Sequence, residues 1–231
     1  MQMGISVQEQ VYQALRAAIL ELKLEPGTIV STQELADRLR VSRTPVREAL
    51  IHLQRDGLVI VLPQRETMIS RIDMERVNQE RFMRKNLESA VLGDFIHQVD
   101  AAQMVQLYAL VERQAEVSAQ RKCETLLEYD DAFHGLFFEK AGQQLSWNVL
   151  ELMNTHYQRV RLLNLRRLTS MGEIITQHTK LLQAIESKQT EQARSVLCDH
   201  LCQLDSEEAD LRTAYPNFFT SAEPEYGILL V

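Results

Sequence analysis

The sequence predicts a mainly α-helical fold, with an N-terminal winged helix-turn-helix followed by a C-terminal all-α helical bundle. Two short amphipathic segments joined by a tight turn lie near residue 40, and two short strand-like segments follow them. Helical periodicity then continues to about residue 212. We therefore expect a first domain over residues 1–72, a second domain over residues 73–212 and a C-terminal tail over residues 213–231.

The composition is that of a folded protein that does not enter membranes. Of 231 residues, 45% are hydrophobic, so each part can bury its own core. We find no apolar segment of the secretory type at the N-terminus and no apolar run of about 18 residues, and we therefore expect a cytoplasmic protein. The three cysteines lack CxxC spacing, which indicates free thiols: Cys123, Cys198 and Cys202.

Residues 7–22 predict the first helix, because apolar side chains recur at three- and four-residue spacing: Val7, Val11, Leu15, Ile19 and Leu22. Pro26 and Gly27 then predict a turn. Residues 32–39 and 44–55 are two short amphipathic segments. The connection between them, residues 40–43, is too short for anything but a tight helix-to-helix turn, so the pair predicts a helix-turn-helix.

The second of these segments has the features of a helix that packs on one side and reads DNA with the other. Val46, Leu50 and Leu53 recur at the spacing of a buried stripe. Ser42 suits the N-cap, and Pro45 suits the first turn, where its missing N–H is no loss.

Basic side chains gather at the start of that segment. Arg43, Thr44 and Arg47 lie opposite the apolar stripe, where a recognition helix reaches base edges and phosphates. Between residues 38 and 47 there are four arginines and no acid, although the formal net charge of the chain is −7. Residues 1–70 hold eight basic and eight acidic residues, so the excess acid lies in the second domain. An acidic second domain is compatible with DNA binding when the basic residues are concentrated on the reading helix.

Residues 57–61 and 67–70 read as two short strands, joined by residues 62–66 into the hairpin wing of a winged helix. The candidate DNA-binding residues are Arg38, Arg43, Thr44, Arg47 and, in the wing, Arg65.

The second domain reads as helices at roughly residues 73–97, 100–116, 121–141, 144–168, 173–187 and 190–212. It contains no glycine-rich phosphate loop and no nucleophile elbow. An all-α bundle is therefore the expected architecture.

Four polar side chains fall on the apolar stripes of three of these helices. Asp130 and His134 are four residues apart on one stripe, and His178 and His200 lie on two others. A single histidine on an apolar stripe is usually a core residue. A buried carboxylate together with three imidazoles, however, suits a shared divalent cation.

Other candidate ligands fit this site less well. Cys198 and Cys202 form a competing pair, but they lie roughly 160–200° around the helix from His200. His156 lies near an apolar stripe without an acidic partner, which indicates core or site wall. His52 and His97 are expected to be structural or exposed.

Buried arginines are the candidates for binding an anion. Arg84 lies on the stripe of its helix, where a bare guanidinium is unfavourable unless an anion meets it. Arg159 is a second candidate for the same role. The alternative for Arg84 is an internal ion pair with Glu88 or Asp130. The arginines of residues 161–167 are expected to be solvated or to face another subunit.

Two groups of motifs carry a resemblance to a known family. VSRTPVREAL, followed by DGLV and PQR, resembles the DNA-binding domain of GntR-type transcription regulators. Asp130-x-x-Phe133-His134 with Ala141-Gly142, then Gln177-His178 and Asp199-His200-Leu201, resembles the FCD (FadR C-terminal domain) branch. Two positions depart from the family pattern, since glycine is common where Arg40 and Glu66 stand. The resemblance gives no account of the tail.

The resemblance implies a homodimer that binds a double-stranded DNA operator, more often as a repressor, and responds to a small organic-acid effector. It implies a divalent metal ion with Asp130, His134, His178 and His200 as ligands, and Arg84 in the wall of the effector cavity. Zn²⁺, Ni²⁺ and Mn²⁺ all suit that ligand set.

Two other functions remain as alternatives: a sensor for which the metal itself is the signal, and a metal-dependent enzyme. Because no general base or nucleophile accompanies the metal set, we expect a regulator and not an enzyme.

Overall fold

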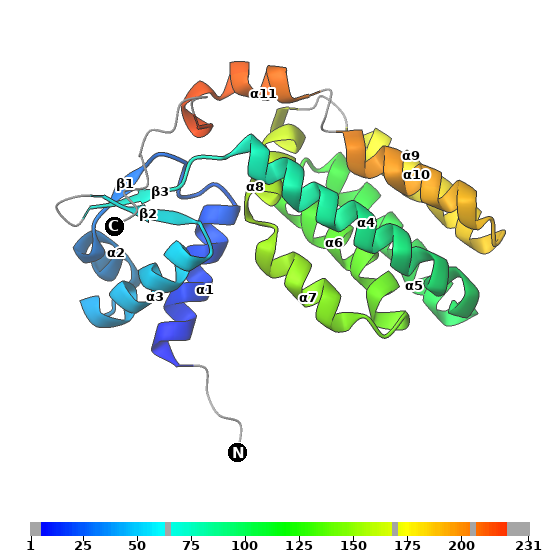
Figure 1. Cartoon of the computed structure of the whole chain (residues 1–231), viewed down its shortest axis with the longest axis horizontal. Helices are drawn as coiled ribbons and strands as arrows, with labels where there is room; N and C mark the ends of the chain where they lie inside the picture. The colour runs from blue at the N-terminus through cyan, green and yellow to red at the C-terminus, as the bar shows by residue number, and fades with distance from the viewer. Residues whose placement is uncertain (1–5, 63–65, 168–170, 204–206, 221–231) are drawn as a thin grey trace. The chain divides into compact units, whose positions relative to one another are not determined.

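The computed structural model describes residues 6–62, 66–167, 171–203 and 207–220 (Figure 1). The described residues form two compact units: the N-terminal unit comprises those up to 75 together with residues 212–220, and the helical unit comprises those between 76 and 211. The predicted division at residues 72/73 lies close to the first limit, but the described residues after 211 group with the N-terminal unit. Within the described residues, no helix is long and apolar enough to cross a membrane.

The N-terminal unit is a winged helix-turn-helix, as predicted. Its elements are α1 (Val7–Leu20), β1 (Ile29–Val30), α2 (Thr32–Leu39), α3 (Arg43–Arg55), β2 (Val59–Val61) and β3 (Thr67–Ile69). The strands form an antiparallel sheet in the order β1-β3-β2, with Val59 opposite Ile69 and Ile29 opposite Met68. β1 was not predicted, since two residues are too few to show a periodicity. α1 packs against α3 over an apolar core.

The apolar stripe of α3 is buried as predicted, with Val46, Leu50 and Leu53 in the core. Ser42 occupies the N-cap position with extended backbone, but its side chain accepts no capping hydrogen bond, which corrects the expected role. By contrast, Ser31 caps α2 by accepting a hydrogen bond from the N–H of Glu34 at 3.1 Å.

Arg40 ends α2 in a left-handed conformation, with φ 56° and ψ 42°. Its N–H donates back to the carbonyl oxygens of Ala36 and Asp37, so the turn into α3 depends on this backbone geometry. A side chain with a Cβ is unfavourable there by roughly 1–2 kcal/mol. This explains why glycine is common at the position in the family that the motifs resemble.

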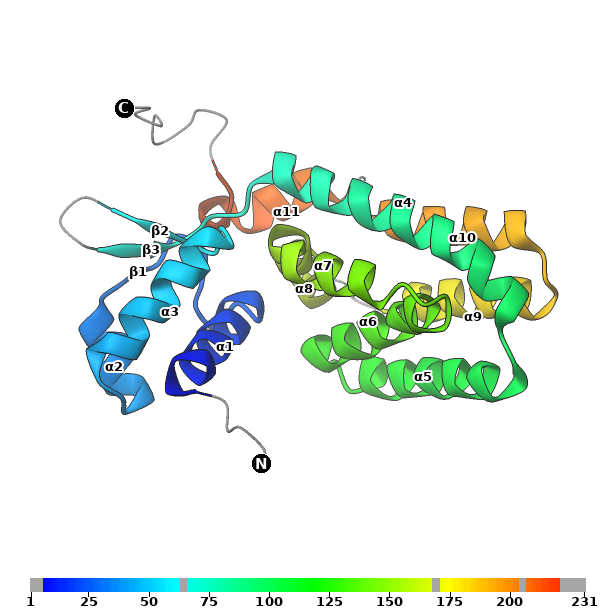
Figure 2. The same ribbon diagram turned by 60° about the horizontal axis from the view of Figure 1, so that its bottom comes forward.

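The helical unit contains α4 (Met74–Gln98), α5 (Ala101–Ala119), α6 (Cys123–Lys140), α7 (Gln144–Met153), α8 (Thr155–Arg167), α9 (Gly172–Glu186), α10 (Thr190–Cys202) and α11 (Glu208–Ala214). The ends of α4 and α11 extend past the limits of the unit. α6 packs against α5, α7 and α8, and α9 packs against α5 and α10 (Figure 2). Aromatic side chains of α6 fill the core: Phe133, Phe137 and Phe138.

Two predicted segments are divided. Residues 144–168 were expected as one helix, but they form α7 and α8 with a break at Asn154. The break is stabilised from outside the segment, because the carboxylate of Glu80 on α4 accepts the N–H groups of His156 and Tyr157 at 2.9 and 2.8 Å. Residues 190–212 form α10 and α11, and Leu204 between them lies outside the described residues.

The described part of the tail folds back on the N-terminal unit. A short 3-10 helix, η3 (Pro216–Phe218), leads to Phe219, which is buried and forms a parallel bridge with Ile72. Ile72 donates to the carbonyl of Phe218 at 2.7 Å, and Thr220 donates to the carbonyl of Ile72 at 2.9 Å. The apolar end of the tail, residues 228–231, lies outside the described residues.

Replacing Arg40 by glycine is expected to stabilise the protein. The change removes the left-handed strain of roughly 1–2 kcal/mol and adds unfolded-state entropy of ~0.5–1 kcal/mol, which leaves a net gain of up to about 1.5 kcal/mol. Arg40→Ala is the matched control, because alanine keeps the Cβ and should change little. Urea unfolding of the three proteins measures the difference, and a glycine variant less stable than the wild type would contradict the argument.

Candidate metal centre and nucleic-acid interface

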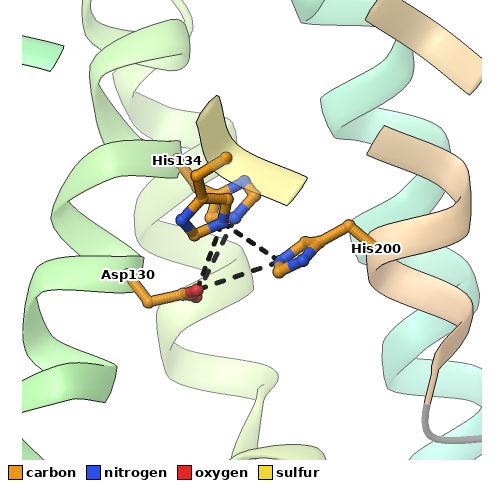
Figure 3. A group of neighbouring side chains, drawn as sticks. Asp130, His134 and His200 are labelled. Carbon is orange, nitrogen blue, oxygen red and sulfur yellow. Dashed lines mark hydrogen bonds and ion pairs between the residues drawn. The ribbon is translucent and has the colours of Figure 1, made fainter. Parts of the chain in front are cut away.

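The four predicted ligands lie together in the helical unit. Asp130 and His134 come from α6, His178 from α9 and His200 from α10. One ligand atom from each residue lies within 4.8 Å of all the others. Figure 3 shows Asp130, His134 and His200 directed toward one another. The helical spacing that placed each residue on an interior stripe therefore also brings them to one point.

The Nε2 atoms of the three histidines face the Asp130 carboxylate. The Oδ1 atom of Asp130 lies 3.4 Å from Nε2 of His178 and 3.8 Å from Nε2 of His200. The Oδ2 atom lies 3.8 Å from Nε2 of His134. The Nε2 atoms of His178 and His200 are 3.3 Å apart. These separations leave a point between the four residues within reach of all of them.

Oxygen atoms on other side chains approach the outer nitrogen of each imidazole. Nδ1 of His178 lies 2.6 Å from Oε1 of Gln114, and Nδ1 of His200 lies 2.8 Å from Oε1 of Gln177. Gln114 donates its amide N–H to the carbonyl of Tyr129 at 3.1 Å, which fixes its oxygen toward His178. Because an amide oxygen only accepts, His178 must donate from Nδ1, and its Nε2 keeps a lone pair for the centre.

The third imidazole is held differently. Nδ1 of His134 lies 2.7 Å from Oε2 of Glu88, although the two are not aligned as a regular hydrogen bond. Nε2 of His134 is buried without a hydrogen-bond partner. A buried polar atom without a partner is costly, and a cation at the centre would satisfy it.

The protonation states suit a metal site. Burial lowers the pKa of His178 well below its usual value, and His200 adds to this effect. Burial also lowers the pKa of His200 to about 3. For Asp130, burial raises the pKa, but Arg161 and the imidazoles outweigh it and hold the pKa far below its usual range. Neutral imidazoles and an ionised carboxylate are the forms that bind a divalent ion, so the residues fit the group.

Two buried arginines surround the acidic side of this cluster. Arg84 donates from Nε to Glu88 at 2.5 Å and from Nη1 to Asp131 at 3.1 Å. Arg161 donates from Nη1 to Asp131 at 2.8 Å and from Nη2 to Asp130. The ion pair of Arg84 with Glu88, the alternative considered from the sequence, is therefore present.

Arg161 corrects an expectation. It was expected to be solvated or to face another subunit, but it is only 8% exposed and pairs with two aspartates. The reason is that α8 is buried on nearly all sides, from Thr155 to Leu165, so no apolar stripe distinguishes its inward face.

A cavity of about 50 Å³ lies beside the cluster. Asp130, His200, Tyr157, Arg161 and Asn164 contribute to its wall. The buried Oδ1 atom of Asn164 has no hydrogen-bond partner. Sequence reasoning did not select Arg161 or Asn164.

The two arginines predicted to bind an effector do not contribute to this wall. Arg84 lies next to Asp130, with its Nη2 atom 3.7 Å from Oδ2 of that residue. Arg159 is fully buried and donates to the carbonyl of Thr155 at 3.0 Å. Burial lowers the pKa of Arg159 to about 10, opposed mainly by Glu80.

His156 is buried outside the cavity wall, and burial lowers its pKa to about 2, so it is a core residue.

Gln114 had a signal in the sequence that was not used. It follows Leu107 and Val111 on the buried stripe of α5, where an amide needs a partner.

The cysteines are free, and the ligand group found among the described residues contains none of them.

The N-terminal unit presents its predicted basic residues on one helix end. Arg43, Thr44 and Arg47 are exposed at the start of α3, on the side opposite its buried stripe. Arg38 is exposed on α2 and pairs with Glu34 at 2.8 Å. Arg65 lies outside the described residues. An exposed, basic helix start on a winged helix-turn-helix is the geometry that enters the major groove.

A winged helix-turn-helix with an exposed, basic start of its second helix indicates a DNA-binding protein. Two family profiles match the chain: bacterial regulatory proteins of the gntR family over residues 7–69, and the FCD domain over residues 81–203. The chain belongs to the GntR family, in the branch that carries an FCD domain. It is a transcription regulator and not an enzyme.

Relatives match over nearly the whole chain. The HTH-type transcriptional repressor RspR of Escherichia coli is 28% identical over 214 residues, which cover 93% of this chain and 94% of the relative. A regulator from an unstable DNA locus of Streptomyces ambofaciens is 30% identical over 218 residues, which cover 94% and 92%. The structure of McbR/YncC of E. coli shares the fold, with a TM-score of 0.75 at 20% identity over 91% of this chain and 99% of that one.

Arg43 and Arg47 are expected to carry DNA recognition. Arg43→Ala and Arg47→Ala should each weaken operator binding by ~1–3 kcal/mol without affecting folding, because both side chains are exposed. Arg113→Ala removes an exposed arginine of α5 that pairs with Glu116, and it should bind like the wild type. A titration at fixed salt against DNA selected by the purified protein measures this, and equal affinity of all four proteins would refute the assignment.

Proposed function

We propose that this protein is a homodimeric repressor whose operator binding is modulated by a small organic acid bound at a divalent metal ion. The observation that carries the proposal is the convergence of Asp130, His134, His178 and His200, with ligand atoms within 4.8 Å of one another. The name of the E. coli relative RspR supports the repressor assignment.

Three imidazole nitrogens and one carboxylate oxygen suit Zn²⁺, Ni²⁺ or Mn²⁺. When bound, the ion supplies a positive centre to which a carboxylate can bind. Gln114 and Gln177 hold two of the imidazoles in the required orientation, and Glu88 lies against the third.

The charges around the centre indicate the class of effector. Arg84 and Arg161 meet three carboxylates, those of Glu88, Asp130 and Asp131, which leaves one net negative charge. A divalent ion changes this to one net positive charge. A buried site with one uncompensated positive charge favours an anion with a single negative charge, so a monocarboxylate is the preferred effector class.

We assign Arg161 and Asn164 to the effector site, because both line the cavity beside Asp130 and His200. Arg84 contributes indirectly: it pairs with Asp131, and Asp131 also pairs with Arg161. A role of Arg159 in effector binding stays a prediction.

Entry of an acid requires a movement of Arg161. A cavity of about 50 Å³ is far smaller than the roughly 300–1,000 Å³ of pockets that bind small organic ligands, so an acid needs more room. If an effector carboxylate replaces Asp130 as the partner of Arg161, α8 shifts relative to α6. The first turn of α8 is held by Glu80 of α4, and α4 begins directly after the winged helix, so the shift reaches the start of α4.

The small cavity also supports a second candidate function, in which the metal alone is the signal. A sensor of this kind needs the four ligands and no room for an organic molecule. Operator binding that responds to metal in the absence of any acid distinguishes it from the first candidate.

Removal of the metal tests both functions. Chelation should lower the melting temperature of the wild type, because a ligand at ~100 times its dissociation constant stabilises by ~2.7 kcal/mol. Chelation should lower the melting temperature of His178→Ala by less, because that variant lacks one ligand and binds the ion more weakly. In operator titrations, a monocarboxylate should change the affinity of the metal-loaded wild type by ~5–150-fold and leave His178→Ala unchanged. Elemental analysis that finds no metal in a fully responsive wild type would exclude the proposed site.

Gln114 is expected to set the metal affinity without touching the ion. Gln114→Leu removes the oxygen that holds Nδ1 of His178, and such outer partners contribute ~10–100-fold in affinity. Gln106→Leu makes the same change at an exposed position of α5 and serves as the control. Competition with a chromophoric chelator measures both, and equal affinities would remove Gln114 from the site.

A further inference from the structure

Residues 212–220 tie the end of the chain back to the N-terminal unit, and we call this segment the C-terminal strap. The match to the FCD domain ends at residue 203, so the strap follows the matched region. The chain leaves the N-terminal unit after residue 75 and returns to it after residue 211. The strap therefore belongs to a second covalent connection between the two units, in addition to the start of α4.

The strap binds the N-terminal unit just after the wing. The N–H of Ile72 donates to the carbonyl of Phe218 at 2.7 Å, and the N–H of Thr220 donates to the carbonyl of Ile72 at 2.9 Å. The side chains of Ile72 and Phe219 are both buried. Ile72 follows the last residue of β3 by three positions, so these contacts hold the end of that wing strand in place.

The strap also lies against the turn that precedes β1 and α2. Arg71 donates from Nε to the carbonyl of Asn217 at 3.2 Å. In the turn, Gly27 has a φ of 84°, and a Cβ there would lie 3.3 Å from Nε of Arg71 and 3.5 Å from the carbonyl oxygen of Asn217. The N–H of Gly27 donates to the carbonyl of Ile69 in β3 at 2.8 Å. The strap therefore touches both the turn before the helix-turn-helix and the end of the wing.

At its other end the strap continues from α11, which is held on α8 by charge. Arg167, the last residue of α8, donates from Nη1 to Asp210 at 3.2 Å and from Nη2 to Glu207. The same helix carries Arg161, which pairs with Asp130 of the candidate metal centre. A movement of α8 therefore acts on α11, from which the strap begins.

Contacts within the strap make it a compact piece. Arg212 donates from Nη1 to the carbonyl of Thr220 at 3.4 Å, and its guanidinium carbon lies 5.3 Å from the centre of the Phe219 ring. The rings of Tyr215 and Phe218 stack with their centres 5.4 Å apart. Because its two ends are joined in this way, the strap is expected to move together with α11.

We propose that the C-terminal strap couples the helical unit to the winged helix, so that the attachment of α11 to α8 influences the end of the wing and the turn before α2. This coupling requires neither a metal nor an acid, and it therefore goes beyond the proposed function. Where an effector does act on α8, the strap provides a second route to the DNA-binding residues, beside the start of α4.

Arg167→Ala tests the coupling from within the helical unit. Loss of its two partly exposed ion pairs should accelerate hydrogen exchange of the Ile72 and Thr220 amides by roughly fivefold. Affinity for DNA selected by the purified protein should fall by a similar factor. Arg166→Ala is the matched control, because it removes the neighbouring ion pair with Glu124 of α6 and leaves α11 attached. It should behave like the wild type in both measurements.

Phe219→Ala breaks the opposite end of the strap and should also weaken DNA binding. Because both variants interrupt one connection, the double variant should bind no more weakly than the weaker of the two single variants. Additive losses, or an Arg167→Ala that matches Arg166→Ala in exchange and in DNA binding, would overturn the strap. Melting curves show which variants are folded, and Phe219→Leu takes the place of Phe219→Ala if that variant is not.

Both measurements are made on the full chain as purified, without an effector. Absence of metal from that protein would overturn the proposed metal site and leave the comparison of Arg167→Ala with Arg166→Ala unchanged. Failure of the strap and failure of the proposed function are therefore separate results.

Discussion

The structure of the helical unit depends on the buried carboxylate of Asp130. Removing an ionised carboxylate from water costs several kcal/mol unless charged and hydrogen-bonding partners compensate it. Here the compensation comes from Arg161 on α8 and from imidazoles on α6, α9 and α10. Because these partners lie on four helices, one charge fixes the positions of four elements relative to one another. A change in the interactions of Asp130 therefore affects all four of these helices.

The same charge connects the centre with the first helix of the unit. Arg161 and the first turn of α8 belong to one short helix, and that turn is held by Glu80 near the start of α4. Burial raises the pKa of Glu80, although hydrogen bonds from the N–H groups of Tyr157 and His156 and from Arg76 oppose this. Because α8 is held by side-chain charge at both places, the proposed function assigns it the role of carrying the effector signal from the centre to the start of α4.

Local patterns in the sequence were sufficient to predict the winged helix and the interior positions of the four candidate ligands. The stripe of Val46, Leu50 and Leu53 and the spacing of Asp130 and His134 depend only on helical periodicity, and both are found in the structure. The break at Asn154 could not be predicted, because Glu80, which stabilises the start of α8, lies more than seventy residues away in the sequence. Arg161 was missed for a related reason: a helix buried on all sides has no stripe to mark its inward face.

X-ray absorption spectroscopy of the metal-loaded protein tests the central claim most directly, because it reports the atoms bound to the ion. The account predicts nitrogen and oxygen neighbours only, with three imidazoles at about 2.0–2.1 Å for Zn²⁺ and one carboxylate oxygen at about 2.0–2.2 Å. A sulfur neighbour at about 2.3 Å would place the ion at Cys198 and Cys202 and contradict the account.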